Sequence, residues 1–423
     1  MKGRKLISYL AALLCVLLSG CVDDSYRGQF DVVPTVDSTP LIPVWITIGD
    51  KADINTPGVA AKGTGLVTGV ENFINRDFHV YAFSQDENVS LATTHSADTV
   101  VCLIDGSIDD ENSRSGRVAR WDSVYERVAW KAGGDIYWPV GHGRGNIYDF
   151  FAYYIDDMEI SDEDIHRTDN KITIDVEIDG SQDLMSSKAE TPEEKLAVKF
   201  PDEKEMIYMK YYCYSYYSAI EDIQPEFYFK HHLVKLDFEM TPGLTPGSSK
   251  SISVRSIAVK SKYKGSFTVA DKSNPSSLGI NFENEYAKLL LAEADGAPFR
   301  DDYIIITEAD PTVTPQPIRI GGSLFVAPGT RYELYVTLSE EREDGVSIGT
   351  TENVVSLYQG SLDDPQPFEA GNQYTITMNV YGRMDVRVSA SLGEWEEKGD
   401  FEYDHDDANR PSNGKEDKGE QKE

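Results

Sequence analysis

The sequence predicts a mainly β protein whose strands pair into antiparallel sandwiches. The main observation is that apolar and polar residues alternate with period two over several segments, which places one side of a strand on a core and the other in water. Helical patterns are few, and Pro-Gly turns at Pro242-Gly243 and Pro328-Gly329 punctuate the alternating segments. No internal repeat of about 20 to 50 residues is visible, which argues against a propeller or a solenoid.

The first 20 residues have the layout of a secretory signal. Lys2, Arg4 and Lys5 precede an apolar run over residues 6–18, which is shorter than the roughly 20 residues that a membrane-spanning helix needs. The run ends in Leu18-Ser19-Gly20-Cys21, which resembles the bacterial lipobox. This motif predicts cleavage between Gly20 and Cys21 and a lipid on the thiol of Cys21.

Residues 21–40 are polar and have no lasting period, so we expect a tether. Alternation then predicts the strands, which lie at 171–179, 232–240, 331–339, 373–381 and 385–392. Thr191 as N-cap and Pro192 at the first helical position predict a short helix up to about residue 200. Residues 284–294 fit either a short helix or a buried strand.

Composition limits the classes of function. The formal net charge of −32 disfavours binding to nucleic acid, because the protein repels phosphate backbones. A hydrophobic share of 40%, with 24 Tyr and 16 Phe, is typical of a folded chain. A single pair of cysteines remains after Cys21, and because Cys102 lies inside the apolar stretch VVCLI, buried free thiols are favoured over a disulfide between Cys102 and Cys213.

The length of 423 residues suggests two domains. The change of pattern around Ile223-Gln224-Pro225 is the predicted boundary, so we expect domains over 41–224 and 225–397. From residue 398 to 423 acidic and small polar residues dominate, which predicts a disordered acidic tail.

A search for catalytic or metal-binding patterns predicts no enzyme, metal or cofactor. The sequence has no Gly-x-Ser-x-Gly, no His-Glu-x-x-His and no Walker loop. The glycine loop 141–145 is not followed by a helical pattern, as a phosphate cradle would require. His231 and His232 are neighbours on a predicted strand and point to opposite faces, so a packing role is favoured over a shared metal ion. The acidic clusters lack the spacing of an EF-hand.

The tyrosine-rich run 208–217 is the remaining candidate for binding. Aromatic platforms can bind sugars, but tyrosine is also a good strand former. Alternation puts Tyr208, Tyr212, Tyr214 and Tyr216 on one face, so we expect a strand here.

Several segments together resemble the fimbrillin-like lipoproteins of Bacteroidota, which are type V pilins and their accessory subunits. Residues 136–157 resemble an aromatic strand pair of that family, through Trp138-Pro139 and the run 151–154. Residues 227–240 resemble the strand that opens its second domain, and residues 370–382 resemble its late Gly-x-x-Tyr strand. Trp395 follows, although the glycine expected soon after it comes only at Gly399.

The resemblance implies two transthyretin-like β-sandwich domains, export as a lipoprotein and assembly in a fimbria by β-strand addition. In stalk subunits of the family an Arg- or Lys-specific protease removes the first strand, which here is the predicted strand 41–49. Lys51 and Lys62 are the basic residues suited to such a cut. The charged end of this chain offers no apolar strand for a neighbour, so an accessory or anchoring role is expected rather than that of the stalk.

The expected function is therefore that of a structural or adhesive fimbrial subunit without catalysis. Its expected partners are other fimbrial subunits, the outer membrane through lipid on Cys21, and receptors on host or bacterial surfaces. Asp23 and Asp24 directly after Cys21 resemble a surface-export signal of Bacteroidota lipoproteins, which implies exposure on the cell surface. The alternative is a surface glycan-binding lipoprotein of a nutrient-uptake system.

Overall fold

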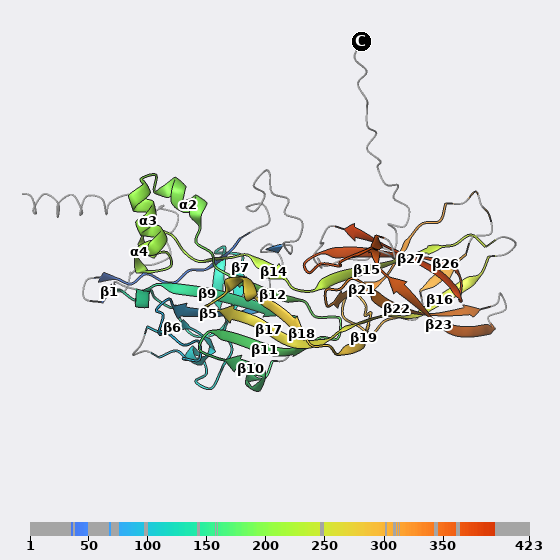
Figure 1. The fold of residues 1–423 in the computed structure, drawn as a ribbon, viewed down its shortest axis with the longest axis horizontal. Coiled ribbons are helices and arrows are strands. Elements are labelled where there is room, and N and C mark those ends of the chain that lie inside the picture. The colour runs from blue at the N-terminus through green and yellow to red at the C-terminus, as the bar shows by residue number, and fades with distance from the viewer. Residues whose placement is uncertain are drawn as a thin grey trace, which may run out of the picture.

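The computed structural model describes residues 35–36, 39–49, 67–68, 76–96, 100–141, 144–156, 158, 160–245, 249–300, 303–307, 310, 312, 314–341, 346–360 and 364–393. The described chain is dominated by strands, which form two sandwiches along the long axis of an elongated molecule (Figure 1). This confirms the prediction of a mainly β, antiparallel fold with few short helices. Within the described residues, no helix has the length and apolar character that crossing a membrane requires.

The first sandwich packs an eight-stranded sheet on a four-stranded one. The large sheet has the order β4 (Val67–Thr68), β14 (Phe229–His231), β12 (Leu184–Lys188), β9 (Tyr148–Ile155), β5 (Asp77–Ser84), β7 (Arg117–Asp122) and β8 (Arg127–Trp130), with β6 (Cys102–Ile104) also paired to β5. The small sheet has the order β10 (Ile165–Arg167), β11 (Lys171–Glu177), β17 (Lys264–Asp271) and β18 (Gly279–Phe282).

The second sandwich pairs a four-stranded with a five-stranded sheet. The four-stranded sheet has the order β21 (Ile318–Val326), β15 (Val234–Pro242), β26 (Gln373–Gly382) and β27 (Asp385–Gly393). The other has the order β19 (Tyr286–Leu290), β16 (Ser251–Lys262), β22 (Tyr332–Glu341) and β23 (Ser347–Leu357), with β20 (Ile304–Ile306) on β16. Short pairs complete the strands, namely β1 (Thr35–Val36) with β2 (Thr39–Pro40), β3 (Thr47–Ile48) with β13 (Glu226–Phe227), and β24 (Gln359–Gly360) with β25 (Pro365–Gln366).

Both faces of the large sheet in the first sandwich are buried. On β9, Phe151 and Tyr153 join a core cluster shared with the small sheet, while Phe150 and Ala152 join a second cluster on the opposite face. This explains why β5 and β9 read as nearly continuous apolar and aromatic runs, since a strand covered on both sides has no solvent face to mark.

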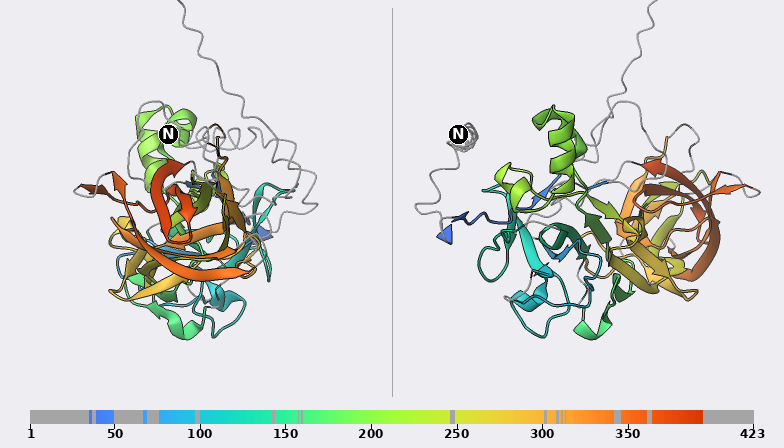
Figure 2. Two further views of the ribbon diagram at one scale, coloured as in Figure 1. Left: turned by 90° about the vertical axis from the view of Figure 1, so that its right-hand side faces the viewer. Right: turned by 60° about the vertical axis from the view of Figure 1, so that its left-hand side comes forward.

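A cap of three short helices covers the opposite face of that sheet. The helices are α2 (Glu193–Lys199), α3 (Glu203–Tyr211) and α4 (Tyr216–Ile220), and they stand on the side away from β10 and β11 (Figures 1 and 2). The short helix predicted near residue 192 is present as α2, although Pro192 is its N-cap. The strand predicted over residues 208–217 is wrong, because α3 and α4 occupy that run. The ambiguous residues 284–294 contain strand β19.

The predicted boundary at 224/225 does not coincide with the division between the sandwiches. A long hairpin crosses from one to the other, because β16 continues into β17, and β18 continues into β19. Pairing runs from Ala258↔Leu290 in the second sandwich to Thr268↔Gly279 in the first. Strands on both sides of residue 225 therefore build the small sheet, and the change of pattern at 223–225 marks only the end of the helical cap.

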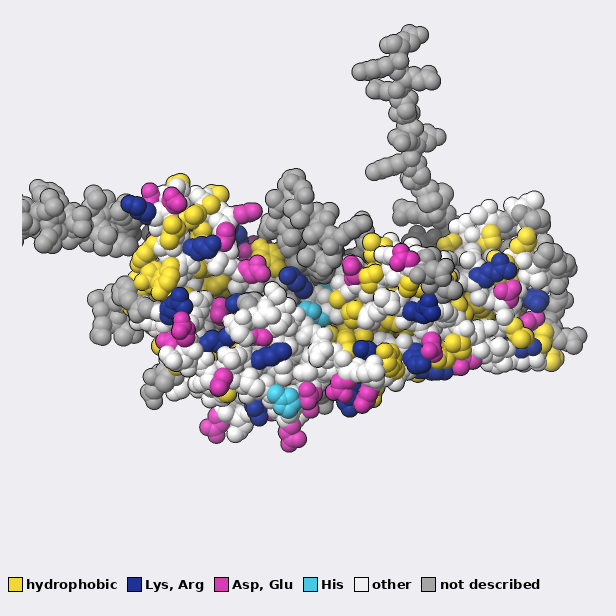
Figure 3. All heavy atoms as spheres, in the orientation of Figure 1, with side chains coloured by type: hydrophobic (Ala, Val, Ile, Leu, Met, Phe, Trp, Pro, Cys, Tyr) yellow, Lys and Arg dark blue, Asp and Glu magenta, His cyan; other side chains and the backbone are white. Residues whose placement is uncertain are grey.

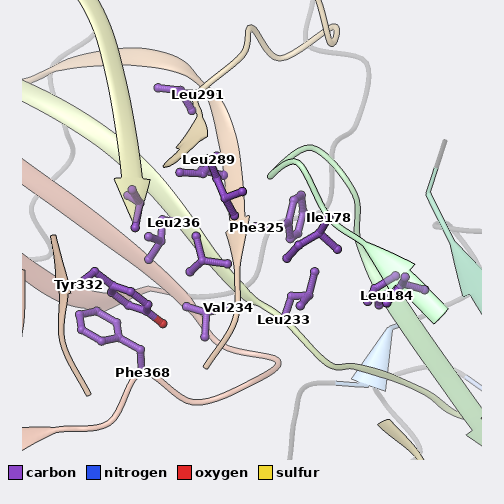
Figure 4. Packing of buried hydrophobic residues seen from close by; sticks show 14 of the residues in the cluster. Ile178, Leu184, Leu233, Val234, Leu236, Leu289, Leu291, Phe325, Tyr332 and Phe368 are labelled. Atoms are coloured by element: carbon purple, nitrogen blue, oxygen red, sulfur yellow. The ribbon is translucent and has the colours of Figure 1, made fainter. Parts of the chain in front are cut away.

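One core cluster is continuous through the junction between the sandwiches. Ile178 and Leu233 lie near Phe325 there (Figure 4). The Phe325 amide donates to the Gly180 carbonyl at 2.8 Å, and the Ile178 amide donates to the Tyr263 carbonyl at 2.7 Å. Shared core and shared strands make the two sandwiches one packed unit.

Both faces of β15 are buried, whereas the alternation in the sequence predicted only one buried face. Val234, Leu236 and Phe238 are buried as predicted, but Lys235 and Asp237 on the other face are also buried, at 3% and 7% exposure. Asp237 accepts hydrogen bonds from Ser323 Oγ at 2.6 Å and Gln373 Nε2 at 2.8 Å. Polar partners on the neighbouring strands satisfy this carboxylate.

Candidate strand-addition site

The segment 40–49, called here the leading segment, lies as an extended strand on the first sandwich. Its side chains alternate, because Val44, Ile46 and Ile48 are buried at 5%, 1% and 5% exposure, whereas Trp45 and Thr47 are only partly buried. The three buried side chains belong to the cluster on the cap-side face of the large sheet. Within the predicted strand 41–49, only Thr47–Ile48 forms a regular strand, and the rest is extended chain.

One edge of the leading segment is hydrogen-bonded to β8 and to the stretch that follows it. The Val44 amide donates to the Ile136 carbonyl at 2.7 Å, and the Trp138 amide donates to the Ile42 carbonyl at 2.9 Å. The Val128 amide donates to the Ile46 carbonyl at 2.9 Å. This edge is antiparallel, with Pro43 opposite Tyr137.

The other edge runs parallel to β13, the strand that follows the helical cap. The Thr47 amide donates to the Pro225 carbonyl at 3.0 Å, and the Gly49 amide donates to the Phe227 carbonyl at 2.9 Å. Thr47 is opposite Glu226 in this pairing. The leading segment is therefore an interior strand, held on both edges by chain that is distant in sequence.

Aromatic side chains form the floor and the end of this site. Trp138, Phe150 and Phe227 are buried at 1%, 0% and 0% exposure and share the cluster with Ile46. Tyr216 of α4 donates from its hydroxyl to the Pro40 carbonyl at 3.1 Å. Loss of the leading segment would uncover this apolar floor, so the site requires a strand with alternating apolar side chains.

The processing residues that the sequence indicated lie outside the described residues. These are Gly20 and Cys21 at the predicted lipidation site and Lys51 and Lys62 at the predicted cuts. The disordered tail predicted for 398–423 and the signal 1–20 lie outside as well. The last described strand, β27, pairs only with β26 in its sheet.

The two cysteines within the described chain are free thiols, which confirms the favoured prediction. Both are buried, and they belong to different core clusters. Burial raises the pKa of Cys213 to about 12 and the pKa of Cys102 well above its usual value. Neither thiol is activated for nucleophilic chemistry, since only a thiolate attacks.

His231 and His232 have separate roles in packing, as the sequence favoured. His231 Nδ1 lies 2.6 Å from Asp183 Oδ2, while His232 Nε2 lies 2.7 Å from Ser186 Oγ. Within the described residues, no group of three or more His, Cys, Asp or Glu side chains is arranged to hold a metal ion.

Acid should weaken the fold through His232. Burial lowers the pKa of this imidazole to about 4. Between roughly pH 6.5 and 4, His232 is therefore protonated in the unfolded chain but stays neutral in the folded chain. Stability from this group is complete above pH 6.5 and falls as the pH drops. We expect the free energy of unfolding to fall less between pH 7 and pH 4 in His232→Gln than in the wild type, measured by urea unfolding at each pH. An identical loss in both proteins would contradict this assignment.

The comparisons with known proteins bear on the family. Residues 106–395 match the family model described as fimbrillin-like, and no curated protein matches the chain. Solved structures of low identity are similar over most of the chain. One is a fimbrial protein from Bacteroides vulgatus, with 13% identity, 84% of this chain and 100% of that chain covered, and a TM-score of 0.42.

Two further structures come from Porphyromonas gingivalis. The fimbrial anchor protein Mfa2 has 11% identity, with 84% of this chain and 98% of that chain covered and a TM-score of 0.28. The tip fimbrial protein Mfa3 has 8% identity, with 83% and 99% covered and a TM-score of 0.25. The family match spans more than half of the sequence and includes the cap, β13 and the strands of the second sandwich. This chain belongs to the fimbrillin-like family.

Proposed function

We propose that this protein is a structural or adhesive subunit of a cell-surface fimbria, without catalysis, exported as a lipoprotein and held in the outer membrane by lipid on Cys21. The observation that carries the proposal is the leading segment, in a chain of the fimbrillin-like family. This segment is hydrogen-bonded along both of its edges, and its apolar side chains cover the aromatic floor. Its partners are other fimbrial subunits and receptors on host or bacterial surfaces.

Strand addition is the proposed mode of assembly. A segment that is held by main-chain hydrogen bonds and three alternate side chains can be replaced by an equivalent segment of a neighbour, which is β-augmentation. In a stalk subunit, a cut after Lys51 or Lys62 would free the leading segment from the rest of the chain. The vacated floor would then take a strand from another subunit.

An accessory or anchoring role is proposed rather than that of the stalk. Val386, Val388 and Ala390 of β27 pack against this molecule's own core, so β27 cannot leave without uncovering apolar surface. The residues after it are mostly charged or small and offer little that burial would stabilise. We therefore propose that this chain keeps β27 in its own sheet and stays uncut, so that the lipid on Cys21 remains attached and a neighbour's strand enters by displacing the leading segment from the floor.

A surface glycan-binding protein of a nutrient-uptake system is the second candidate. Tyr208 and Tyr211 on α3 are exposed at 49% and 48%, and their rings contact Tyr212 at 4.6 and 4.9 Å between centroids. Hydrophobic side chains gather over this cap on the surface (Figure 3). Binding to a carbohydrate array that is lost in Tyr208→Ala and Tyr211→Ala would favour this candidate.

Replacement of Cys21 tests the lipid anchor. Bacterial lipoproteins carry two or three acyl chains, and more than one chain gives stable membrane association. We expect Cys21→Ala to release the protein into soluble fractions or to stall it as a precursor, measured by membrane fractionation and intact mass. Cys102→Ala is the matched control and should fractionate as the wild type does. Normal retention of Cys21→Ala in the membrane would contradict lipidation at this residue.

A further inference from the structure

Gln224 binds the parallel edge of the leading segment through its side chain, beside the two main-chain hydrogen bonds of that edge. Thr47 and Gly49 donate to the carbonyls of Pro225 and Phe227. By the same spacing Trp45 should donate to a carbonyl two residues before Pro225. The chain at that point is leaving the helical cap, where the Ile223 amide donates to the Ser218 carbonyl at 2.8 Å. The side chain of Gln224 supplies the acceptor instead.

The Gln224 carbonyl oxygen receives two hydrogen bonds. The Trp45 amide donates to Oε1 at 3.3 Å, and the indole Nε1 of Trp138 donates to the same oxygen at 3.2 Å. Trp138 is almost fully buried in the floor of the site and also binds Ile42 through its amide. The side-chain amide of Gln224 thus links Trp45 on the parallel edge to Trp138, which lies in the floor and holds the antiparallel edge.

We infer that Gln224 is a positioning residue that fixes the register of the strand in this site and restricts which strands of a neighbouring subunit fit. The restriction on the incoming strand rests on the proposed function. A strand placed in this site must offer an N–H at the positions of residues 44, 45, 47 and 49, so proline is excluded there. The leading segment obeys this rule, since its prolines are Pro40 and Pro43.

Two further features complete the rule for the incoming strand. Apolar side chains are required at the positions of Val44, Ile46 and Ile48, which reach the core. At position 49 a Cβ would lie 2.0 Å from Tyr228 Cε1, so any residue larger than glycine requires the ring to move. A slip by one residue would turn the apolar set away from the floor and would also misplace the N–H that Gln224 binds.

Amide exchange in the full-length protein tests the role of Gln224 itself. In Gln224→Leu the acceptor is lost at nearly constant size, and we expect the Trp45 amide to exchange at least about tenfold faster, because a hydrogen bond of ordinary strength is removed. The Val44 amide, bound to Ile136 on the other edge, should keep its rate. Gln224→Glu retains an acceptor oxygen and should stay near the wild-type rate. Equal acceleration at Val44 and Trp45, or no change at either, would overturn the inference.

Peptides corresponding to residues 39–49 test the restriction on partners. The full chain is prepared with a unique protease site inserted between residues 50 and 62, cut while folded, and exposed to labelled peptide that replaces the leading segment. N-methylation at position 45 should weaken binding to the wild-type site roughly tenfold and leave binding to Gln224→Leu unchanged. N-methylation at position 44 should weaken binding to both proteins equally. Equal losses at position 45 in both proteins would contradict the rule.

These outcomes are separable from the proposed function. If the protein is absent from isolated fimbriae, the fimbrial role fails, whereas the exchange rate of Trp45 and the coupling between Gln224 and position 45 are unaffected. If the protein is present in fimbriae but the exchange rate of its Trp45 amide does not change in Gln224→Leu, the fimbrial role stands and the positioning role fails.

Discussion

Arg167→Ala is expected to lower the free energy of unfolding by about 3 to 5 kcal/mol, because it leaves a buried carboxylate without its counter-charge. Arg167 Nη1 donates to Asp105 Oδ2 at 2.7 Å, and the two side chains are 2% and 0% exposed. The guanidinium also donates to the carbonyls of Leu91 at 2.8 Å and Thr93 at 2.6 Å. One side chain on β10 therefore ties the loop before β6 and the end of β6 to the small sheet.

The carboxylate of Asp105 has further partners that hold it in place. Its Oδ1 accepts from Ser107 Oγ at 2.6 Å and from the Ser107 amide at 3.1 Å. In Arg167→Ala these contacts keep the charge inside, where it is poorly solvated. Lys264→Ala is the matched control, because its partner Glu177 and Lys264 itself are both exposed, and exposed pairs add little. Urea unfolding of both variants checks the prediction, and similar stability of the two would contradict it.

Ile46→Asp should detach the leading segment from the first sandwich. Ile46 is 1% exposed, and burial of an unpaired carboxylate at that place costs several kcal/mol, more than the segment's main-chain bonds return. We expect faster amide exchange at Val44, Thr47 and Gly49 and a lower unfolding midpoint. Thr47→Asp, on the opposite face of the same segment, should change both much less.

Comparison of these two variants also tests the alternation in the leading segment. If Thr47→Asp loosened the segment as much as Ile46→Asp, the two faces would not differ in burial as described. If neither variant changed amide exchange, the segment would not depend on its side chains for binding. Either outcome would remove the physical basis for strand replacement at this site.

The strand pattern was readable from the sequence wherever one face meets the core and the other meets water. Ile172, Ile174 and Val176 of β11 are buried and Asp175 and Glu177 are exposed, because the small sheet covers the core on one side only. The same reasoning predicted the buried apolar face of β15 but missed the burial of its polar face, where Asp237 has polar partners on β21 and β26. Those partners are distant in sequence, and alternation alone carries no information about them.

The helical cap shows a different limit. Tyrosines in the run 208–217 favour strand by propensity, but Asp202 accepts from the amides of Lys204 and Glu205 and starts a helix. An N-cap directly after Pro201 was a local signal for α3 that the sequence-based prediction did not use, because it followed the density of aromatic residues. Packing of Met209, Cys213 and Tyr216 on the large sheet then fixes the cap.

The resemblance to the family predicted strand addition at the strand 41–49 but not the residues that hold this strand. Its alternating side chains are local information, whereas its partners at 136–138 and 224–227 come from contacts across the fold. Gln224 lies 179 positions from Trp45, so its role as acceptor could not be read from either stretch alone. The sequence-based suggestion of a domain boundary at Ile223-Gln224-Pro225 thus fell on a part of the site.

Intact mass measurement of the protein extracted from surface fimbriae tests the central proposal most directly. A lipid-anchored accessory subunit that keeps its leading segment predicts a chain starting at Cys21, with a mass increased by its acyl groups. A chain that starts after Lys51 or Lys62, without acyl groups and in stable multimers, would instead be a processed stalk subunit and would contradict the account.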